Sequence, residues 1–120
     1  MSNLALIQAR MGSTRLPGKV MLSLDCIPVI QHIVRRTLSA DCIDRAVVAT
    51  TRKNSDDVIA RYASKECAGV YRGNENDVLG RMHRASKESE ADTVVRVTAD
   101  NPLLSPETID TAVRKLNRTD

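Results

Sequence analysis

The sequence predicts an α/β fold with a mostly parallel sheet. Short apolar runs alternate, along all 120 residues, with stretches whose apolar residues recur at helical spacing. This alternation is typical of parallel crossover connections, which build a Rossmann-like three-layer α/β/α sandwich. The length fits one domain, residues 1–120, and the hydrophobic fraction of 42% is enough for a core. That core must be aliphatic, because Tyr62 and Tyr71 are the only aromatic residues.

Four apolar runs predict the strands. In chain order they lie at residues 4–7, 46–50, 70–71 and 93–98. Each is short and bounded by turn-forming or polar residues, as expected for strands buried on both faces of a parallel sheet.

Four amphipathic stretches predict the helices that connect and follow these strands. They lie at residues 28–39, 56–66, 77–89 and 106 to about 116. Prolines in the first turn of the first and last helices fit a helix start. Asn54 or Ser55 can cap the second helix. Leu79 is expected on the buried face of the third helix, with Val78, Met82 and Ala85.

Composition argues against several classes of partner. The net charge is +3, without a tract of successive Lys and Arg or interleaved aromatic residues, so nucleic acid is not expected. No apolar run approaches the roughly 20 residues of a membrane span, and the N-terminus lacks the pattern of a secretory signal. Cys26, Cys42 and Cys67 are odd in number and widely spaced. They fit the reduced thiols of a cytoplasmic protein better than disulfides or a zinc site.

The segment of residues 8–19 follows the first expected strand and carries three cations. These are Arg10, Arg15 and Lys19, and the same segment contains glycines and hydroxyl side chains. Loops at the carboxyl ends of strands are where open α/β sheets bind ligands, and glycine lets backbone amides approach an anion. The spacing fits neither the Walker motif nor the dinucleotide fingerprint. A nucleotide is the leading ligand, and a solvated basic loop is the alternative.

A second segment places a carboxylate at a strand end. Asp100 follows the expected strand 93–98 and precedes Asn101-Pro102. A carboxylate at this edge can hold Mg²⁺, which prefers oxygen ligands and bridges substrate phosphates. The alternative is an aspartate turn before Asn-Pro. Arg96 lies inside the same apolar strand, and if buried it needs a carboxylate, a phosphate or a structural ion pair.

The segment 8–19 resembles the signature loop of the sugar nucleotidyltransferases that use CTP. The form found here is most similar to spore-coat polysaccharide and acylneuraminate cytidylyltransferase-like proteins, and it is also similar to the CMP-Kdo synthetases. The matching residues are Ala9, Arg10, Ser13, Arg15, Leu16, Pro17 and Lys19. Asp100 matches the family's metal-binding position, although Ala99 and Asn101 depart from its pattern. The stretch that begins Arg72-Gly73 resembles the family's segment near the base and ribose, and a strand-to-helix turn is the alternative there.

The resemblance implies transfer of CMP from CTP to a sugar with release of pyrophosphate, in polysaccharide or glycoconjugate precursor synthesis. It implies catalytic roles for Arg10 and Lys19, and Mg²⁺ at Asp100. The nucleotide-binding residues that it implies are Ala9, Arg10, Gly12, Ser13, Arg15, Lys19, Arg72, Gly73 and Thr98. CTP and a sugar are the expected partners, and a homodimer stays open.

The resemblance covers only the N-terminal part of the family domain, so we expect a fold that is incomplete on its C-terminal side. Two other functions remain open at this point. One is a catalytically incomplete nucleotide-binding domain with a regulatory or interaction role. The other is a nucleotidyltransferase with a different base preference.

Overall fold

The computed structural model describes residues 3–11, 21, 23–24, 27–66, 68–74, 78–98 and 106–118. Its centre is a four-stranded sheet in the order β5-β4-β1-β6. These strands are β1 (Asn3–Gln8), β4 (Arg45–Thr51), β5 (Gly69–Gly73) and β6 (Thr93–Thr98). Every neighbouring pair is parallel, which confirms the predicted α/β class.

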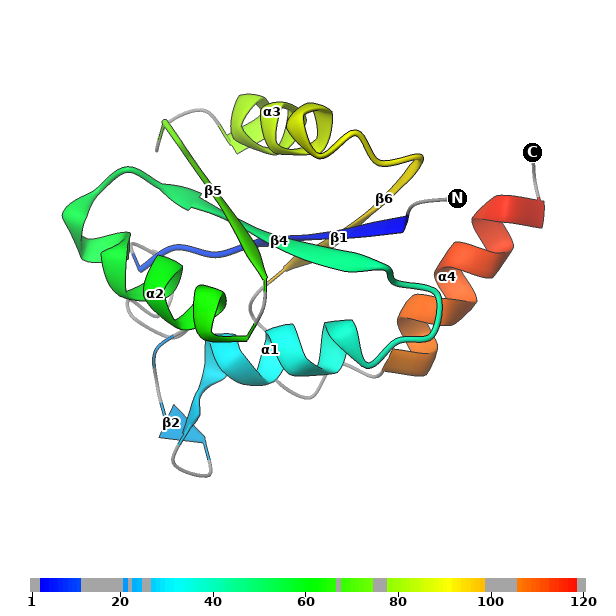
Figure 1. Ribbon diagram of the computed structural model, residues 1–120, viewed down its shortest axis with the longest axis horizontal. Coiled ribbons are helices and arrows are strands. Elements are labelled where there is room, and N and C mark those ends of the chain that lie inside the picture. The colour runs from blue at the N-terminus through cyan, green and yellow to red at the C-terminus, as the bar shows by residue number, and fades with distance from the viewer. Residues whose placement is uncertain are drawn as a thin grey trace.

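Helices cover both faces of the sheet and make three layers (Figure 1). On one face lie α1 (Val29–Leu38), α2 (Asp57–Lys65) and α4 (Pro106–Arg118), and on the other lies α3 (Val78–Ser89). The four helices predicted from apolar spacing are therefore all present. Within the described ranges, no helix is both long enough and apolar enough to cross a membrane.

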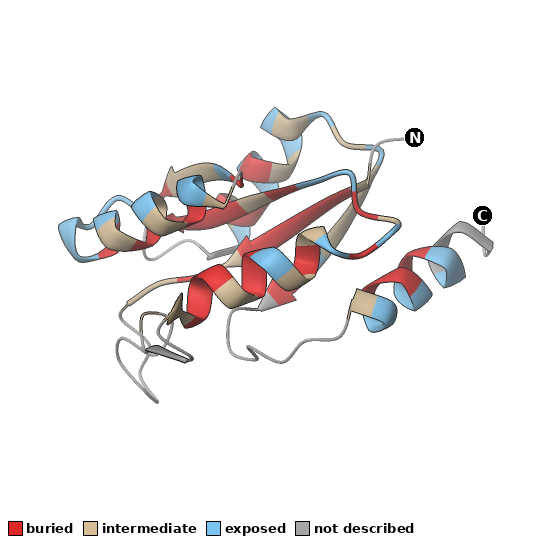
Figure 2. Cartoon of the chain, turned by 60° about the horizontal axis from the view of Figure 1, so that its bottom comes forward, coloured by how far each residue is buried: buried red, intermediate tan, exposed pale blue. Residues whose placement is uncertain are grey.

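Two apolar clusters fill the space between these layers. The larger cluster joins the sheet to α1, α2 and α4 and includes Ile7, Ile33 and Val48, none of which is exposed to solvent. The smaller cluster lies under α3 and includes Leu6 and Met82. Leu6 and Ile7 belong to different clusters because successive side chains of a strand point to opposite faces. Buried positions accordingly concentrate in the central strands and on the inner side of α1 (Figure 2).

A short antiparallel ribbon was not predicted from the sequence. It consists of β2 (Ser23–Leu24) and β3 (Ile27–Pro28) and directly precedes α1. Two residues per strand are too few for an alternation of apolar and polar residues to be recognised.

The prediction that Leu79 is buried was wrong. Its side chain is 78% exposed, whereas Arg81 is 0% exposed. Residues two apart lie on nearly opposite sides of an α-helix, which has 3.6 residues per turn. Because Arg81 lies on the inner face of α3, Leu79 lies on the outer face. Apolar spacing misplaced this face because it does not count a charged residue as core.

The prediction that Asn54 or Ser55 caps the second helix was also wrong. Both residues lie in a 3₁₀ turn, η2 (Asn54–Asp56), and the residue before α2 is Asp56. No side chain makes a capping hydrogen bond at the start of α2. The Asp56 carboxylate instead has partners on other segments, described below.

A buried carboxylate holds α4 against the loop between α1 and β4. Asp110 accepts hydrogen bonds from the backbone N–H groups of Cys42, at 2.6 Å, and Asp41, at 3.0 Å. The bond from Cys42, followed by that from Asp41, lowers the pKa of the Asp110 carboxyl, although partial desolvation opposes this. The two amides lie before the start of β4, so Asp110 acts at the amino-terminal edge of the sheet.

We expect Asp110→Asn to lower the free energy of unfolding at pH 7 and to reduce its loss in acid. A carboxyl whose pKa is lowered by folding stabilises the native state above its unfolded pKa, about 3.9. This contribution disappears as the pH falls through the lower, folded pKa. Urea unfolding at pH 7 and pH 3 measures both effects, with Asp41→Asn as an exposed control. Equal pH dependence in the wild type and Asp110→Asn would contradict the role given to Asp110.

Candidate functional site

The four parallel strands all end at one edge of the sheet. β1 and β6 pair in register from Asn3–Thr93 to Gln8–Thr98, so their last residues lie side by side. Chain order reverses between these two strands, because β4 and β5 extend the sheet on one side of β1 and β6 is added on the other. Open α/β sheets bind ligands outside the carboxyl ends of their strands at such a reversal. Both candidate segments predicted from the sequence begin here.

The structure locates only part of the predicted site. Ala9 is buried, and its N–H donates to the Ala49 carbonyl at 3.1 Å, which extends the contact with β4 one residue beyond β1. Arg10 follows and is half-buried. The Thr98 backbone pairs with Gln8. Gly12, Ser13, Arg15, Lys19 and Asp100 lie outside the described residues, and the side chain of Thr98 does too. The ligand-binding roles of these residues stay predictions.

Asp56 connects the segments that follow β1 and β4. The Met11 N–H donates to its Oδ1 at 2.8 Å, and the Thr51 hydroxyl donates to its Oδ2. Asp56 is 1% exposed. The Lys53 N–H in turn donates to the Thr51 hydroxyl oxygen at 3.2 Å. The sequence indicated Asp56 only as a residue at the start of a helix, and its partner Met11 is 45 positions away.

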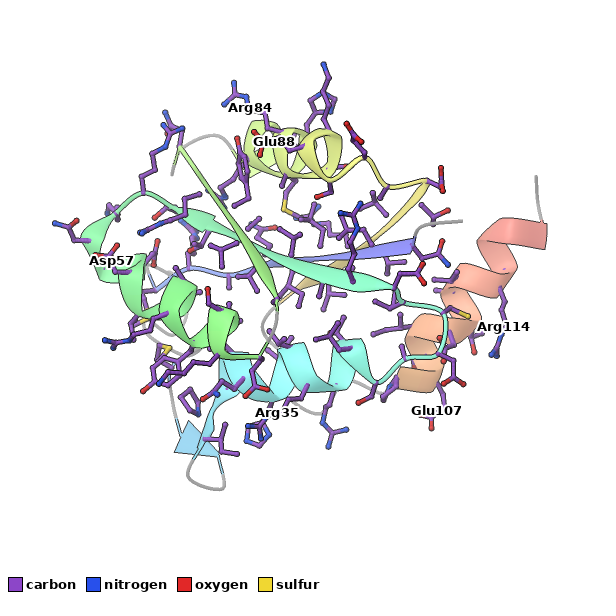
Figure 3. The ribbon with its side chains drawn as sticks, viewed as in Figure 1. Arg35, Asp57, Arg84, Glu88, Glu107 and Arg114 are labelled. Carbon is purple, nitrogen blue, oxygen red and sulfur yellow. The ribbon has the colours of Figure 1, made fainter. Side chains whose placement is uncertain are left out.

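Arg72 braces the loop after β4. Its Nε donates to the Thr51 carbonyl and its Nη2 to the Lys53 carbonyl, both at 2.7 Å. Its Nη1 forms an ion pair with the Asp57 carboxylate at 2.7 Å, and the Arg72 side chain is 29% exposed. Figure 3 shows Asp57 at the start of α2, beside this loop. Each guanidinium nitrogen thus contacts the protein, and the predicted contact of Arg72 with a base stays a prediction.

Gly73 ends β5 where α3 packs closely. A Cβ atom at this position would lie 2.9 Å from Cγ of Arg81 and 3.2 Å from Cε1 of Tyr71. The Nη1 of Arg81 donates to the Asn74 carbonyl at 3.1 Å. Absence of a side chain at Gly73 therefore lets the buried arginine reach the turn after β5. This packing explains the glycine independently of any ligand contact.

Arg96 makes a contact that the sequence did not predict. Its Nη2 donates to Oε1 of Gln8 at 2.7 Å, and the residue is exposed. The partner is a neutral amide on the neighbouring strand. A carboxylate, phosphate or ion pair was expected only for a buried Arg96, and the residue is exposed. Arg10 and Arg96 add positive charge near this edge, which favours an anionic ligand, whereas the charge of Arg72 is paired with Asp57.

A metal site is not formed by the described residues alone. Within them, no group of three or more His, Cys, Asp or Glu side chains is placed to hold a metal ion. Asp100 lies outside the described residues, so its role as a ligand of Mg²⁺ stays a prediction.

Comparison with known proteins assigns the chain to a family. The cytidylyltransferase family model matches residues 4–120. The chain belongs to this family. A solved structure of a cytidylyltransferase from Leptospira borgpetersenii is 37% identical, with a TM-score of 0.90, and the match covers 96% of this chain and 48% of that one. The resemblance seen in the sequence, and the fold that it implied, are thus confirmed.

Two relatives match with similar identity. The spore coat polysaccharide biosynthesis protein SpsF of Bacillus subtilis is 36% identical over 115 residues, which are 92% of this chain and 48% of the relative. The 3-deoxy-manno-octulosonate cytidylyltransferase of Pelobacter propionicus is 37% identical over 115 residues, 93% of this chain and 43% of the relative. The chain therefore spans about half the length of the curated cytidylyltransferase-family proteins that it matches.

Proposed function

We propose that this chain provides the CTP-binding part of a cytidylyltransferase that transfers CMP to a sugar and releases pyrophosphate. The observation that carries the proposal is the pairing of Gln8 with Thr98 at the reversal point of the sheet. It brings together the ends of the two strands that precede the cationic loop and Asp100. Membership of the cytidylyltransferase family supports CTP as the nucleotide. The name of the SpsF relative supports a role in making a polysaccharide or glycoconjugate precursor.

The proposed mechanism relies on position and charge. Backbone amides near Gly12 and the hydroxyl of Ser13 hold the triphosphate, and Arg15 neutralises it further. Arg10 and Lys19 stabilise the charge that develops on the α-phosphate and on the departing pyrophosphate. A sugar oxygen then attacks the α-phosphorus in line with the leaving group. Asp100 would hold Mg²⁺, which when bound supplies further positive charge to the phosphates.

The proposal includes a cytoplasmic location, which the odd number of cysteines supports. Cys42 is a free thiol in the described part of the chain. A homodimer stays a prediction.

A second candidate is a nucleotide-binding domain that does not catalyse. The observation that favours it is the extent of the matches, which cover about half of each relative. A 120-residue chain assayed by itself would lack any metal ligand or sugar contact that the remaining half of such a relative supplies. We therefore expect the 120-residue chain to bind CTP weakly with Mg²⁺ and to turn over poorly or not at all.

Thermal unfolding with a panel of nucleoside triphosphates tests the binding proposal, because a ligand that binds only the native state stabilises it. We expect CTP to stabilise the chain more than ATP, GTP or UTP does, and only with Mg²⁺. Asp100→Asn should remove the Mg²⁺ dependence without changing the fold measured by circular dichroism. A pyrophosphate-release assay with candidate sugars then separates the two candidates.

The outcomes have distinct meanings. No stabilisation by CTP would contradict the proposed nucleotide, and stronger stabilisation by another triphosphate would reassign the base. Robust formation of a CMP-sugar by the 120-residue chain would show that this half is catalytically sufficient.

A further inference from the structure

We propose that Asp56 is a positioning residue of the triphosphate site. Its carboxylate fixes the point at which the cation-bearing segment after β1 leaves the sheet. This inference rests on the proposed function. It concerns a residue to which neither the sequence motifs nor the resemblance gave a role in binding.

The backbone around Arg10 is held on both sides. Before it, the Ala9 N–H donates to the Ala49 carbonyl at 3.1 Å. After it, the Met11 N–H donates to Oδ1 of Asp56 at 2.8 Å. Arg10 is the single residue between these two bonds, so its Cα position is determined by β4 and by Asp56.

Asp56 is itself held firmly. The Thr51 hydroxyl donates to its Oδ2, and its own N–H donates to the Lys53 carbonyl at 3.0 Å. It immediately precedes α2, where the helix dipole favours a negative charge. Hydrogen bonds to an ionised carboxylate are stronger than neutral ones, and at 1% exposure little water competes for it.

The loop that carries Asp56 is fixed from the other side by β5. Arg72 binds the carbonyls of Thr51 and Lys53 and the carboxylate of Asp57. A continuous set of polar contacts therefore runs from β5, through residues 51–57, to the segment after β1. The only carboxylate in this set that reaches the segment after β1, within the described residues, is that of Asp56.

Loss of this contact should displace Arg10, a proposed phosphate-binding cation, more than it disturbs the fold. A misplacement of about 1 Å can cost a factor of roughly 100 in a reaction that depends on alignment. For binding, loss of a buried hydrogen bond predicts a weakening of about tenfold. The carboxylate is also a negative charge near a proposed site for a polyanion. If Asp56 acted mainly through this charge, its removal would strengthen the binding of CTP.

Two substitutions at Asp56 separate position from charge. Asp56→Ala removes both the charge and the acceptor of the Met11 N–H. Asp56→Asn removes the charge, but its amide oxygen can still accept from Met11 while its amide N–H donates to the Thr51 hydroxyl. We expect Asp56→Ala to weaken binding of both CTP and inorganic tripolyphosphate by about tenfold, and Asp56→Asn to remain within about threefold of the wild type.

Asp110→Ala is the matched control. Like Asp56, Asp110 is buried, with 6% exposure, and accepts hydrogen bonds from backbone N–H groups. It differs in lying at the amino-terminal edge of the sheet. It should lower thermal stability without changing the affinity of the folded protein for CTP. Hydrogen exchange at the Met11 amide gives a second readout, which should be faster in Asp56→Ala and not in Asp110→Ala.

Thr51→Val covers the case in which Asp56→Ala does not fold. It keeps the carboxylate and removes the hydroxyl that donates to Oδ2. We expect CTP affinity to fall by a smaller factor, about threefold, with faster exchange at Met11. Unchanged affinity and unchanged exchange in this variant would overturn the positioning role.

Three further outcomes distinguish failure of this inference from failure of the proposed function. If the wild type binds CTP and Asp56→Ala binds it equally well, this inference fails and the proposed function stands. If Asp56→Ala and Asp56→Asn both bind more tightly, the carboxylate acts through charge and the positioning role is overturned. If the wild type binds neither CTP nor tripolyphosphate, the proposed function fails and this inference fails with it.

Discussion

Replacing Lys19 by alanine is expected to weaken CTP binding by about 1–3 kcal/mol, the cost of losing a charged hydrogen bond to phosphate. It should also reduce the salt dependence of binding, because fewer charge contacts remain to be screened. Calorimetry at low and high salt measures both effects. The prediction depends on the position of the segment after β1, at the carboxyl edge of the sheet where chain order reverses.

Lys65→Ala is a suitable control for Lys19→Ala. Lys65 is exposed at the end of α2, with its Nζ 4.7 Å from the centre of the Tyr62 ring, and its removal changes the net charge equally. It should leave the affinity for CTP nearly unchanged. If the two variants behave alike, Lys19 is a solvated surface residue and the phosphate-binding interpretation of the loop is incorrect.

Ile33→Ala is expected to lower the free energy of unfolding by about 2–5 kcal/mol, because it removes buried methyl groups and leaves a cavity. Ile33 is 0% exposed and lies in the cluster between α1 and the sheet. Leu79→Ala deletes a similar aliphatic side chain that is 78% exposed, and its effect should stay within about 0.5 kcal/mol. Urea unfolding of both variants measures the difference. A large loss in Leu79→Ala would mean that the first turn of α3 is buried, contrary to the structure.

The fold was largely predictable because its strands and helices have clear apolar spacing. β1 has four successive buried residues, and α1 carries a stripe of buried apolar residues. Two of the three differences from the predictions have clear physical causes. The ribbon of β2 and β3 is too short to leave a pattern. The side chain of Arg81 fits beside Gly73, which has no side chain, and donates a hydrogen bond to the Asn74 carbonyl. The apolar spacing of the helix does not indicate either feature.

The location of the site was more predictable than its contacts. Parallel strands end at one edge, so the order of the elements predicts that the segments after β1 and β6 share this edge. The pairing of Gln8 with Thr98 is seen only in the structure. The bond between Met11 and Asp56 joins residues 45 positions apart, and only the folded chain reveals it. The contacts of Arg72 with backbone carbonyls were equally hidden, since every residue has a carbonyl and the sequence does not mark which ones accept.

The place of β1 in the sheet has a consequence for the order in which the molecule is completed. β1 is synthesised well before β6, yet the two are neighbours in the sheet, and Asn3 pairs with Thr93. At about 5–20 residues per second, a ribosome needs roughly 5–20 s to make the chain between them. During this interval one side of β1 presents unpaired backbone groups, which can pair with a strand of another nascent chain. Conditions that slow translation between residues 8 and 93 should therefore increase aggregation of newly made protein. The stability of protein that has already folded should not change.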